Sequence, residues 1–291
     1  MGRYANIGYV FIAPSVVLIG LTLMYPMIEG LNISFFDMGI DFQRRFVGLD
    51  NYRVVLVNPT FWSTVWRTLY FSLVSGVASL ALGLGLALLL NMEGLWFRAF
   101  WRVLFIVPWT ISHVAAGLSW KWIFDSLYGV ANDLLMRVGI IAEPIVWLGT
   151  RDWAMFSVIV ANIWRSYPFV MLLLLAALQT IPKDQYESAA VDGSSPWQRF
   201  VYVTLPHLKF AIFVATAMDF IFNVRQFDLI YVMTRGGPRD STEMMSTLVN
   251  RQAFEFFDYG VAAATSMAML AMLVVATLAY RRLMRSATET A

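Results

Sequence analysis

Residues 68–90 read TLYFSLVSGVASLALGLGLALLL, a run of 23 residues without one charged side chain. A helix that crosses the hydrocarbon core of a bilayer needs about 20 mostly apolar residues. This run therefore predicts a membrane-spanning helix.

The rest of the chain shares this apolar character. Its 291 residues are 59% hydrophobic and 14% charged, whereas a soluble domain is about half apolar and about a quarter charged. A soluble core of this size could not hide so much apolar surface, so lipid must cover part of it. The composition excludes a soluble enzyme and a disordered chain. The sequence contains no Cys, so it has no disulfide scaffold and no thiolate metal site. It also lacks the dense stripe of basic residues that nucleic-acid binding requires.

Further stretches on both sides of residues 68–90 have the length and composition of membrane spans. The six expected spans are Tyr9–Leu31, Thr68–Leu90, Val103–Phe124, Trp153–Leu178, Phe210–Val232 and Tyr259–Tyr280. A membrane barrel would show short alternating strands instead, and these are absent from the sequence. We therefore expect an all-α integral membrane protein with six transmembrane helices. An N-terminal span with an external segment (1–66) and a transmembrane core (67–291) would form one membrane domain.

Six spans place both termini on the same side of the membrane. Nine Lys and Arg residues lie outside the spans on each side, so their number does not decide the orientation. The run Arg281-Arg282-Leu283-Met284-Arg285 adjoins the end of the last span, where basic residues count most. This run predicts that the termini are cytoplasmic.

The loop between the fourth and fifth spans, residues 181–206, predicts two short helices. Asp184 is expected to cap the first helix, with Glu187 three residues later completing a capping box. Gly193 is placed to end that helix in a left-handed conformation. The segment Ser195–Gln198 is expected to begin the second helix with a capping box of its own.

One face of the first short helix is built from small residues. Tyr186, Ala189, Ala190 and Gly193 share this face at helical spacing. Three of the four are small, so another backbone can approach closely. Two interpretations remain open: the helix docks into a cleft of a cytoplasmic partner, or it lies as an amphipathic loop on the membrane surface.

The same loop carries a family resemblance. Glu187, Ala189 and Gly193, followed by Leu205-Pro206 with Pro206 thirteen residues after Gly193, resemble the EAA loop of ABC-importer permeases. Ser188 stands where that family usually has its first Ala. The segment Thr234–Pro238 resembles the Thr-x-Gly-Gly-Pro signature of the first-type permease subunit in the carbohydrate uptake family.

Other segments resemble the same family in order along nearly the whole chain. They are Phe11–Pro14, Tyr25-Pro26, Phe46–Tyr52, Val107–Trp109, Trp120–Trp122, Gly129–Asn132 and Trp164–Phe169. The resemblance implies a permease of the cytoplasmic inner membrane of a prokaryote. It implies a second, similar permease, two ATPase subunits that bind ATP and Mg²⁺, an extracytoplasmic solute-binding protein, and a sugar or sugar derivative as substrate.

The resemblance also assigns roles to residues. The EAA loop would be a cytoplasmic coupling helix seated in a groove of the ATPase, and its rigid-body movement would turn the pathway from inward-facing to outward-facing. The implied coupling residues are Tyr186, Glu187, Ala189, Ala190, Asp192, Gly193, Leu205 and Pro206. The chain has no Gly-x4-Gly-Lys-Ser/Thr motif, so we expect a transport subunit that is not itself an enzyme and holds no cofactor.

Polar residues within the spans are candidates for the substrate pathway, because ionisable groups inside a membrane are costly. Aromatic rings near them are platforms on which a sugar could stack. The pathway candidates are Trp109, Trp120, Asn162, Arg165, Asp219, Asn223 and Arg225. The alternative is that the polar groups pair with one another and the aromatic rings only pack. The two His residues, His113 and His207, lie far apart, and we expect no metal site.

Two further expectations concern surfaces. Arg235, Gly236, Gly237 and Pro238 are candidates for docking the binding protein, and residues 128–136 could form a short amphipathic helix nearby. In the second span, Ser79, Gly83 and Ala87 form a small-residue face that predicts close helix packing.

Two other classes of function stay open at this point. A self-contained secondary transporter would have no use for a coupling loop, and no inverted repeat is visible. An integral membrane enzyme would need an acidic cluster or a His-rich metal pattern, and neither is visible in the sequence. The sequence does not identify the sugar or its charge.

Overall fold

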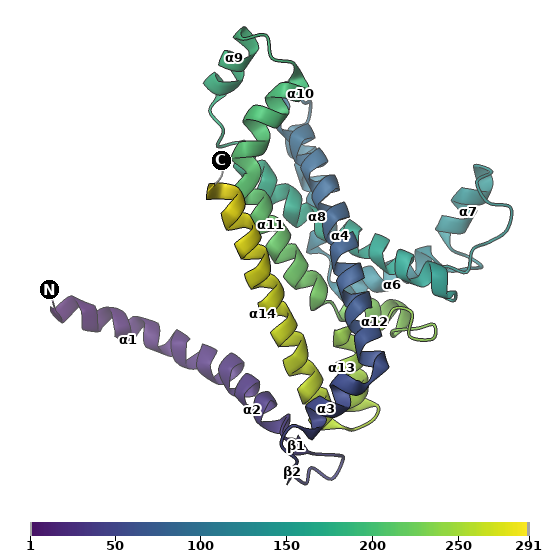
Figure 1. Ribbon diagram of the computed structural model, residues 1–291. Coiled ribbons are helices and arrows are strands. Elements are labelled where there is room, and N and C mark those ends of the chain that lie inside the picture. Colours follow the sequence, from purple (N-terminus) through teal and green to yellow (C-terminus); the bar gives the residue numbers. More distant parts are fainter. Residues whose placement is uncertain (1, 290–291) are drawn as a thin grey trace. The chain divides into compact units, whose positions relative to one another are not determined.

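A computed structural model describes the chain from residue 2 to residue 289, with side chains from residue 11 to residue 282 (Figure 1). Arg285 of the expected basic run lies outside the described side chains. The chain forms two compact units. The first comprises the chain up to Ser63 together with Leu248–Val274, and the second comprises Thr64–Thr247 together with the residues from Val275 onward.

The first unit begins with a long apolar rod. It consists of α1 (Gly2–Ile19), the π-helical turn η1 (Gly20–Met24) and α2 (Tyr25–Ile33). Phe11–Ile33 is long and apolar enough to cross a membrane, and none of its most apolar window is buried. Its C-terminal end, Ile33, lies two residues beyond that of the expected span, Leu31.

After the rod, polar contacts hold together a small hub, which consists of the two strands and the short helix in residues 36–57. Strand β1 (Phe36–Asp37) pairs antiparallel with β2 (Arg45–Phe46), and α3 (Asp50–Val57) follows. Asn51 Nδ2 donates to the carbonyl oxygens of Ser34 and Phe36, both at 2.9 Å. A Cβ atom at Gly260 would lie 2.3 Å from the oxygen of Phe36. Only glycine therefore lets the first turn of α14 (Tyr259–Glu289) approach this hub.

The second unit holds most of the membrane-spanning helices. Its elements are α4 (Pro59–Asn91, most of which lies in this unit), α5 (Arg98–Thr110), α6 (His113–Ile123), α7 (Val130–Arg137), α8 (Arg151–Leu178), α9 (Lys183–Val191), α10 (Pro196–Arg199), η2 (Phe200–Thr204, a π-helical turn), α11 (Leu205–Val224) and α12 (Asp228–Thr234). Helix α13 (Met245–Phe254) and α14 each run from one unit into the other.

Among the described residues, five helices are long and apolar enough to cross a membrane, or six if the bent pair α5 and α6 counts as one span. The all-helical membrane fold is confirmed. The prediction of one continuous third span over Val103–Phe124 is wrong, because α5 and α6 meet at 96°. Ser112 caps α6 by accepting a hydrogen bond from the Ala115 backbone at 3.2 Å. A capped start makes this point the beginning of a new helix.

The predicted fifth span, Phe210–Val232, is also wrong at its C-terminal end. Helix α11 ends at Val224, and α12 begins separately at Asp228. The residues between them are Arg225-Gln226-Phe227, and Phe227 leaves the helical region with φ −120° and ψ −60°. An average of hydropathy hides this short break because apolar residues continue on both sides.

The small-residue face of α4 packs closely against α8. A Cβ atom at Gly83 would lie 3.0 Å from both the Met171 backbone nitrogen and the Val170 side chain, and Ala87 is fully buried. Ser79 Oγ and Ser166 Oγ share a hydrogen bond at 2.8 Å. The predicted close packing at this face is confirmed.

Candidate functional site

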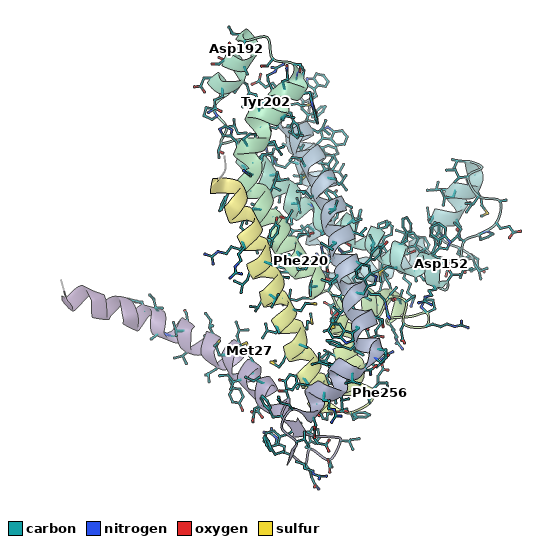
Figure 2. All side chains as sticks on the ribbon, in the orientation of Figure 1. Met27, Asp152, Asp192, Tyr202, Phe220 and Phe256 are labelled. Atoms are coloured by element: carbon teal, nitrogen blue, oxygen red, sulfur yellow. The ribbon has the colours of Figure 1, made fainter. Side chains whose placement is uncertain are left out.

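The loop between α8 and α11 forms two short helices beyond the ends of the long ones, and Asp192 lies near its tip (Figures 1 and 2). Gly193 has φ +74°. The Ser194 backbone N–H donates to the Ala189 oxygen at 3.0 Å, and that of Gly193 donates to the Ala190 oxygen at 3.1 Å. These two bonds form a Schellman motif, which ends α9 in the left-handed turn that the sequence predicts.

The helix starts confirm one predicted cap and contradict the other. In α10, Ser195 Oγ accepts from the Gln198 backbone at 3.3 Å, and Gln198 Oε1 accepts from the Ser195 backbone at 2.8 Å. The predicted cap at Asp184 is wrong, because α9 begins at Lys183 with Pro182 as its N-cap and no side-chain cap bond. Asp184 lies in the first turn, where its charge is favourable to the helix dipole.

The face of α9 that carries Tyr186 turns partly inward. The Tyr186 hydroxyl shares a hydrogen bond at 2.9 Å with Oγ1 of Thr204, which is buried. The Tyr186 ring packs against an apolar cluster that includes Leu178, Ile181 and Leu208. Thr204 is a contact that sequence reasoning missed, because nothing in the local pattern links it to a residue in α9.

The other implied coupling residues lie in α9, in the turn that follows it and at the start of α11. Glu187, Ala190, Asp192 and Gly193 are exposed, and Ala189 is partly exposed. Leu205 and Pro206 stand at the first two positions of α11, directly after the π-helical turn η2. This part of α9 is therefore accessible to solvent.

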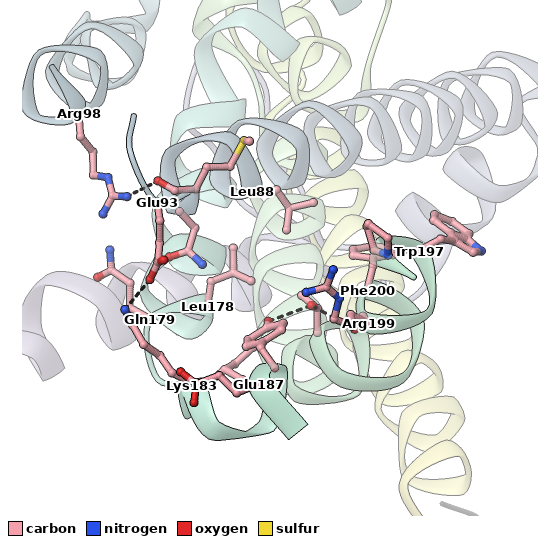
Figure 3. A pocket seen from close by; sticks show the side chains of 16 residues that line it. Leu88, Glu93, Arg98, Leu178, Gln179, Lys183, Glu187, Trp197, Arg199 and Phe200 are labelled. Carbon is pink, nitrogen blue, oxygen red and sulfur yellow. Dashed lines mark hydrogen bonds and ion pairs between the residues drawn. The ribbon is translucent and has the colours of Figure 1, made fainter. Parts of the chain in front are cut away.

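A cavity of about 1090 Å³ lies between α9 and the ends of the long helices (Figure 3). Its lining comes from α4, α5, α8, α9, α10 and η2, and includes Leu88, Arg98, Leu178, Lys183, Trp197 and Phe200. Lys183 forms an ion pair with Glu93 beside the cavity. The hydrogen bond from Lys183 lowers the pKa of Glu93, and the same contact raises the pKa of Lys183, so the pair is charged at neutral pH.

Three of the predicted pathway residues meet in the interior of the second unit. Asn162 Nδ2 on α8 donates to Asn223 Oδ1 on α11 at 2.8 Å. Asn223 Nδ2 in turn donates to Asp219 Oδ2 at 2.9 Å. All three side chains are buried, with 1–4% of their surface exposed. They form a polar trio that links two membrane-spanning helices.

The remaining pathway candidates lie elsewhere. Arg165 Nε donates to the Ile111 oxygen at 3.2 Å and so satisfies a carbonyl at the break between α5 and α6. Trp120 packs edge-on to Trp164 at 5.7 Å between ring centroids. The centroid of the Trp109 ring lies 6.1 Å from that of the Phe169 ring, and Trp109 is exposed. Arg225 is the exposed C-cap of α11. No hydrogen bond within the described part of the chain joins these four side chains to the polar trio.

The segment Arg235–Pro238 forms a tight turn that is braced from within. Thr242 Oγ1 donates to the Gly237 oxygen at 2.7 Å and shares a hydrogen bond at 2.7 Å with Thr234 Oγ1. Gly236 has φ +84°, and a Cβ atom there would lie 2.7 Å from Glu243 Oε2. Gly236 is therefore required by the turn itself. Arg235 is exposed, and Gly237 and Pro238 are partly exposed.

Residues 130–137 form α7, so the short helix predicted near this position is confirmed. Buried Asn132 acts as its hub: Nδ2 donates to the Ser126 and Ile145 oxygens at 3.3 and 3.0 Å. Its Oδ1 accepts from the Ile145 backbone at 3.1 Å and from Trp147 Nε1 at 2.8 Å. Asn132 belongs to the segment Gly129–Asn132, whose sequence pattern does not predict this role.

Comparison with known proteins adds a family match. Residues 79–288 match the family described as binding-protein-dependent transport system inner membrane component. The sulfoquinovosyl glycerol transport system permease protein SmoG of Agrobacterium fabrum is 36% identical over 279 residues, which cover 94% of this chain and 89% of that protein. The trehalose/maltose transport system permease protein MalF of Thermococcus litoralis is 36% identical over 287 residues, covering 97% and 95%.

A solved structure shares the fold. It is a chain from a bacterial ABC transporter involved in the import of the acidic polysaccharide alginate. The two chains superpose with a TM-score of 0.85 at 23% identity, over 98% of this chain and 96% of the other. At this identity the likeness describes the helical architecture alone.

Proposed function

This chain belongs to the family of binding-protein-dependent transport system inner membrane components, and from that membership we propose how it works. It is the permease subunit of a binding-protein-dependent ABC importer and a multi-pass inner membrane protein. It functions in a complex with a binding protein and an ATPase, and has no catalytic function of its own. The family match lies within the proposed transmembrane core, 67–291, which follows the proposed N-terminal segment, 1–66.

We propose a carbohydrate or a carbohydrate derivative as the substrate. Two relatives that align over more than nine-tenths of this chain are named for the transport of sulfoquinovosyl glycerol and of trehalose and maltose. The substrate would pass between this chain and a second, similar permease. The polar trio of Asn162, Asn223 and Asp219, together with Arg165 and the rings of Trp109 and Trp120, are the groups that we propose near the pathway, with Arg225 at the end of α11.

We propose that α9 is the coupling helix that receives movement from the ATPase. The observation that carries this proposal is a short, exposed helix ended by a glycine turn, with Glu187 and Gly193 accessible beyond the ends of the membrane spans. A rigid element attached to two spans can pass on a rigid-body movement. In this proposal α9 and the termini are cytoplasmic, and Arg235–Pro238 faces the extracytoplasmic binding protein.

The first experiment is an affinity purification of the chain from its native host in mild detergent, with quantitative mass spectrometry of the copurified proteins. We expect one copy of a second permease and two copies of a P-loop ATPase for each copy of this chain. Recovery of the chain alone, or as a homo-oligomer, would contradict the proposal and favour a self-contained secondary transporter.

Transport assays test the coupling helix directly. Glu187→Lys and Gly193→Asp should abolish uptake of the substrate while the chain still inserts into the membrane. Wild-type uptake in both variants would remove the coupling role of α9. The chain expressed without its partners should transport nothing.

A further inference from the structure

We propose that Tyr186 is a positioning residue that ties α9 to the start of α11, so that movement of α9 reaches the fifth span through the hydrogen bond between Tyr186 and Thr204. This inference rests on the proposed coupling function of α9. It gives Tyr186 an inward role, in contrast to the role of partner contact that the spacing on α9 suggests.

The need for such a tie follows from the cavity behind α9. The cavity of about 1090 Å³ lies between Lys183, Tyr186 and Glu187 of α9 and residues at the ends of α4, α5 and α8 (Figure 3). Tyr186 and Glu187 line it on the α9 side, and Leu88 and Leu178 line it on the side of the long helices. A helix that stands over a cavity transmits force through the few side chains that bridge to the helices beneath.

Tyr186 makes the most buried of these bridges. Its ring packs on the apolar cluster of Leu178, Ile181 and Leu208, and its hydroxyl reaches the buried Oγ1 of Thr204 at 2.9 Å. The contact joins residues 18 positions apart, from α9 to the last residue of η2. It is therefore a tertiary contact and is not part of the helical hydrogen bonding of either element.

The second bridge is weaker. Lys183 and Glu93 form an ion pair that links α9 to the turn after α4, but both side chains are 80% exposed. Exposed ion pairs contribute little, because water and salt screen them and two long side chains must be ordered. Of the two bridges, the one made by Tyr186 is the one that can hold α9 in a fixed position.

Thr204 lies at a point where the fifth span can deform. It ends the π-helical turn η2, and Pro206, two residues later, has no backbone N–H to donate to the preceding turn. The ordinary α-helical bonding is therefore interrupted there, and π-helical turns recur at functional sites. A movement of α9 transmitted through Tyr186 therefore acts on a segment of the fifth span in which the regular α-helical hydrogen bonding is interrupted.

The test uses the complete complex, with both permeases, the ATPase and the binding protein, reconstituted in proteoliposomes. Tyr186→Phe removes only the hydroxyl. We expect the number of substrate molecules transported per ATP hydrolysed to fall about threefold to fivefold, which is the scale of one lost hydrogen bond. Thr204→Val should have the same effect, and the double variant should be no worse than either single one, because both remove the same contact.

Tyr202→Phe is the matched control, because it makes the same substitution on an η2 side chain that is 76% exposed. Its transport per ATP should equal that of the wild type. An unchanged ratio in Tyr186→Phe would overturn the inference, whether or not less complex is recovered, because a purely structural role changes the yield and leaves the ratio unaltered.

The failure of this inference is distinguishable from failure of the proposed function. If Glu187→Lys and Gly193→Asp abolish uptake while Tyr186→Phe keeps the wild-type ratio, only the inference about Tyr186 fails. If Glu187→Lys and Gly193→Asp both transport normally, the coupling function of α9 fails, and the inference fails with it.

Discussion

Gly193 shows how one residue sets the geometry of the proposed coupling helix. Its φ of +74° belongs to the left-handed region, yet apart from its neighbours in the chain no heavy atom lies within 4 Å of the position that a Cβ would occupy. The cost of a side chain here is thus backbone strain, about 1–2 kcal/mol for an ordinary L-residue. Asn tolerates this conformation better than Val does, because its short polar side chain can form local hydrogen bonds.

We therefore predict that Gly193→Asn retains most of the uptake and that Gly193→Val loses most of it through backbone strain. Gly193→Asp, which tolerates this conformation as Asn does, should fail through the negative charge that it adds at the proposed ATPase contact. The measurement is initial uptake rate at matched amounts of membrane-inserted chain. If the two variants lost equal activity, the partner would be sensing the absence of any side chain at this position. Backbone conformation would then not be the property that matters.

Asn132 stabilises the fold around α7 through its side-chain hydrogen bonds. One buried amide makes four hydrogen bonds, three that hold α7 to the segment around Ile145 and Trp147 and one to the Ser126 oxygen. Removing it leaves the partly buried backbone groups of Ser126 and Ile145 and the buried Trp147 N–H without this partner. Each unsatisfied buried group costs about 1–3 kcal/mol.

Asn132→Ala should accordingly destabilise the protein by about 2 kcal/mol, the combined cost of leaving one buried and several partly buried polar groups without their partner. The measurement is the midpoint of thermal unfolding of the purified chain in detergent. Asp133→Ala is the matched control, because Asp133 is exposed and forms a surface ion pair with Arg137, where such a pair is worth about 0–1 kcal/mol. Equal midpoints for the two variants would contradict the role assigned to Asn132.

Local spacing predicted bonds between neighbours in the chain, and it could not predict bonds between distant elements. The capping box of Ser195 and Gln198 and the turn at Gly193 were both predictable, because each involves residues at most a few positions apart. The Tyr186 contact with Thr204 and the Asn162 contact with Asn223 depend on how separate helices pack. One helical pattern alone carries no information about that packing.

At the scale of the elements, hydropathy predicted which segments meet the bilayer and missed where the backbone breaks. The third predicted span contains Pro108, and Ser112 caps the second half of it. Both residues are local signals of a helix end, yet the apolar residues on either side outweigh them in any average over about 20 positions. The break leaves the carbonyl oxygen of Ile111 without a helical partner, and Arg165 Nε of α8 donates a hydrogen bond to it. Arg165 is distant in the chain, so the sequence around Ile111 does not predict this bond.

Irregular backbone at membrane depth is tolerated only where protein buries it or where it lines water. Because Ser112 is exposed at the break, we predict that it lines a water-filled space. Ser112→Cys should react with a membrane-impermeant maleimide, and the wild-type chain supplies a clean background because it has no Cys.

The matched control is Val77→Cys, in the middle of α4, where the side chain is exposed on a continuous apolar helix. Lipid should shield this position from the reagent. If Ser112→Cys were as unreactive as Val77→Cys, protein or lipid would cover the break. The break would then not lie beside the substrate pathway.

At the scale of the whole molecule, the order of motifs along the chain predicted the family, because those motifs occur over nearly its full length. The substrate could not be predicted in the same way. The polar trio uses its amide and carboxylate groups on one another, and Arg165 uses its Nε on a backbone carbonyl. Polar residues in spans thus indicate where helices are joined as readily as where a sugar passes, and sequence alone does not separate the two.

The orientation of the complete molecule in the membrane gives the last prediction. Val191 on α9 is 88% exposed, and Leu127, just before α7, is 81% exposed. If α9 faces the cytoplasm, an impermeant maleimide should label Leu127→Cys in right-side-out vesicles and Val191→Cys in inside-out vesicles. Each variant should be unreactive in the opposite preparation, because six spans place these two loops on opposite sides.

The same two variants also report on assembly. Val191→Cys should react readily in the purified chain and be protected in the complex with its ATPase, since a helix seated in a groove loses its exposure. Leu127→Cys should not respond to the ATPase, because the membrane lies between them. If the labelling in the two vesicle preparations were reversed, the topology would be the opposite of the proposed one, with α9 outside the cytoplasm. Unchanged labelling of Val191→Cys on assembly would mean that the ATPase contacts this chain at a surface other than the exposed face of α9.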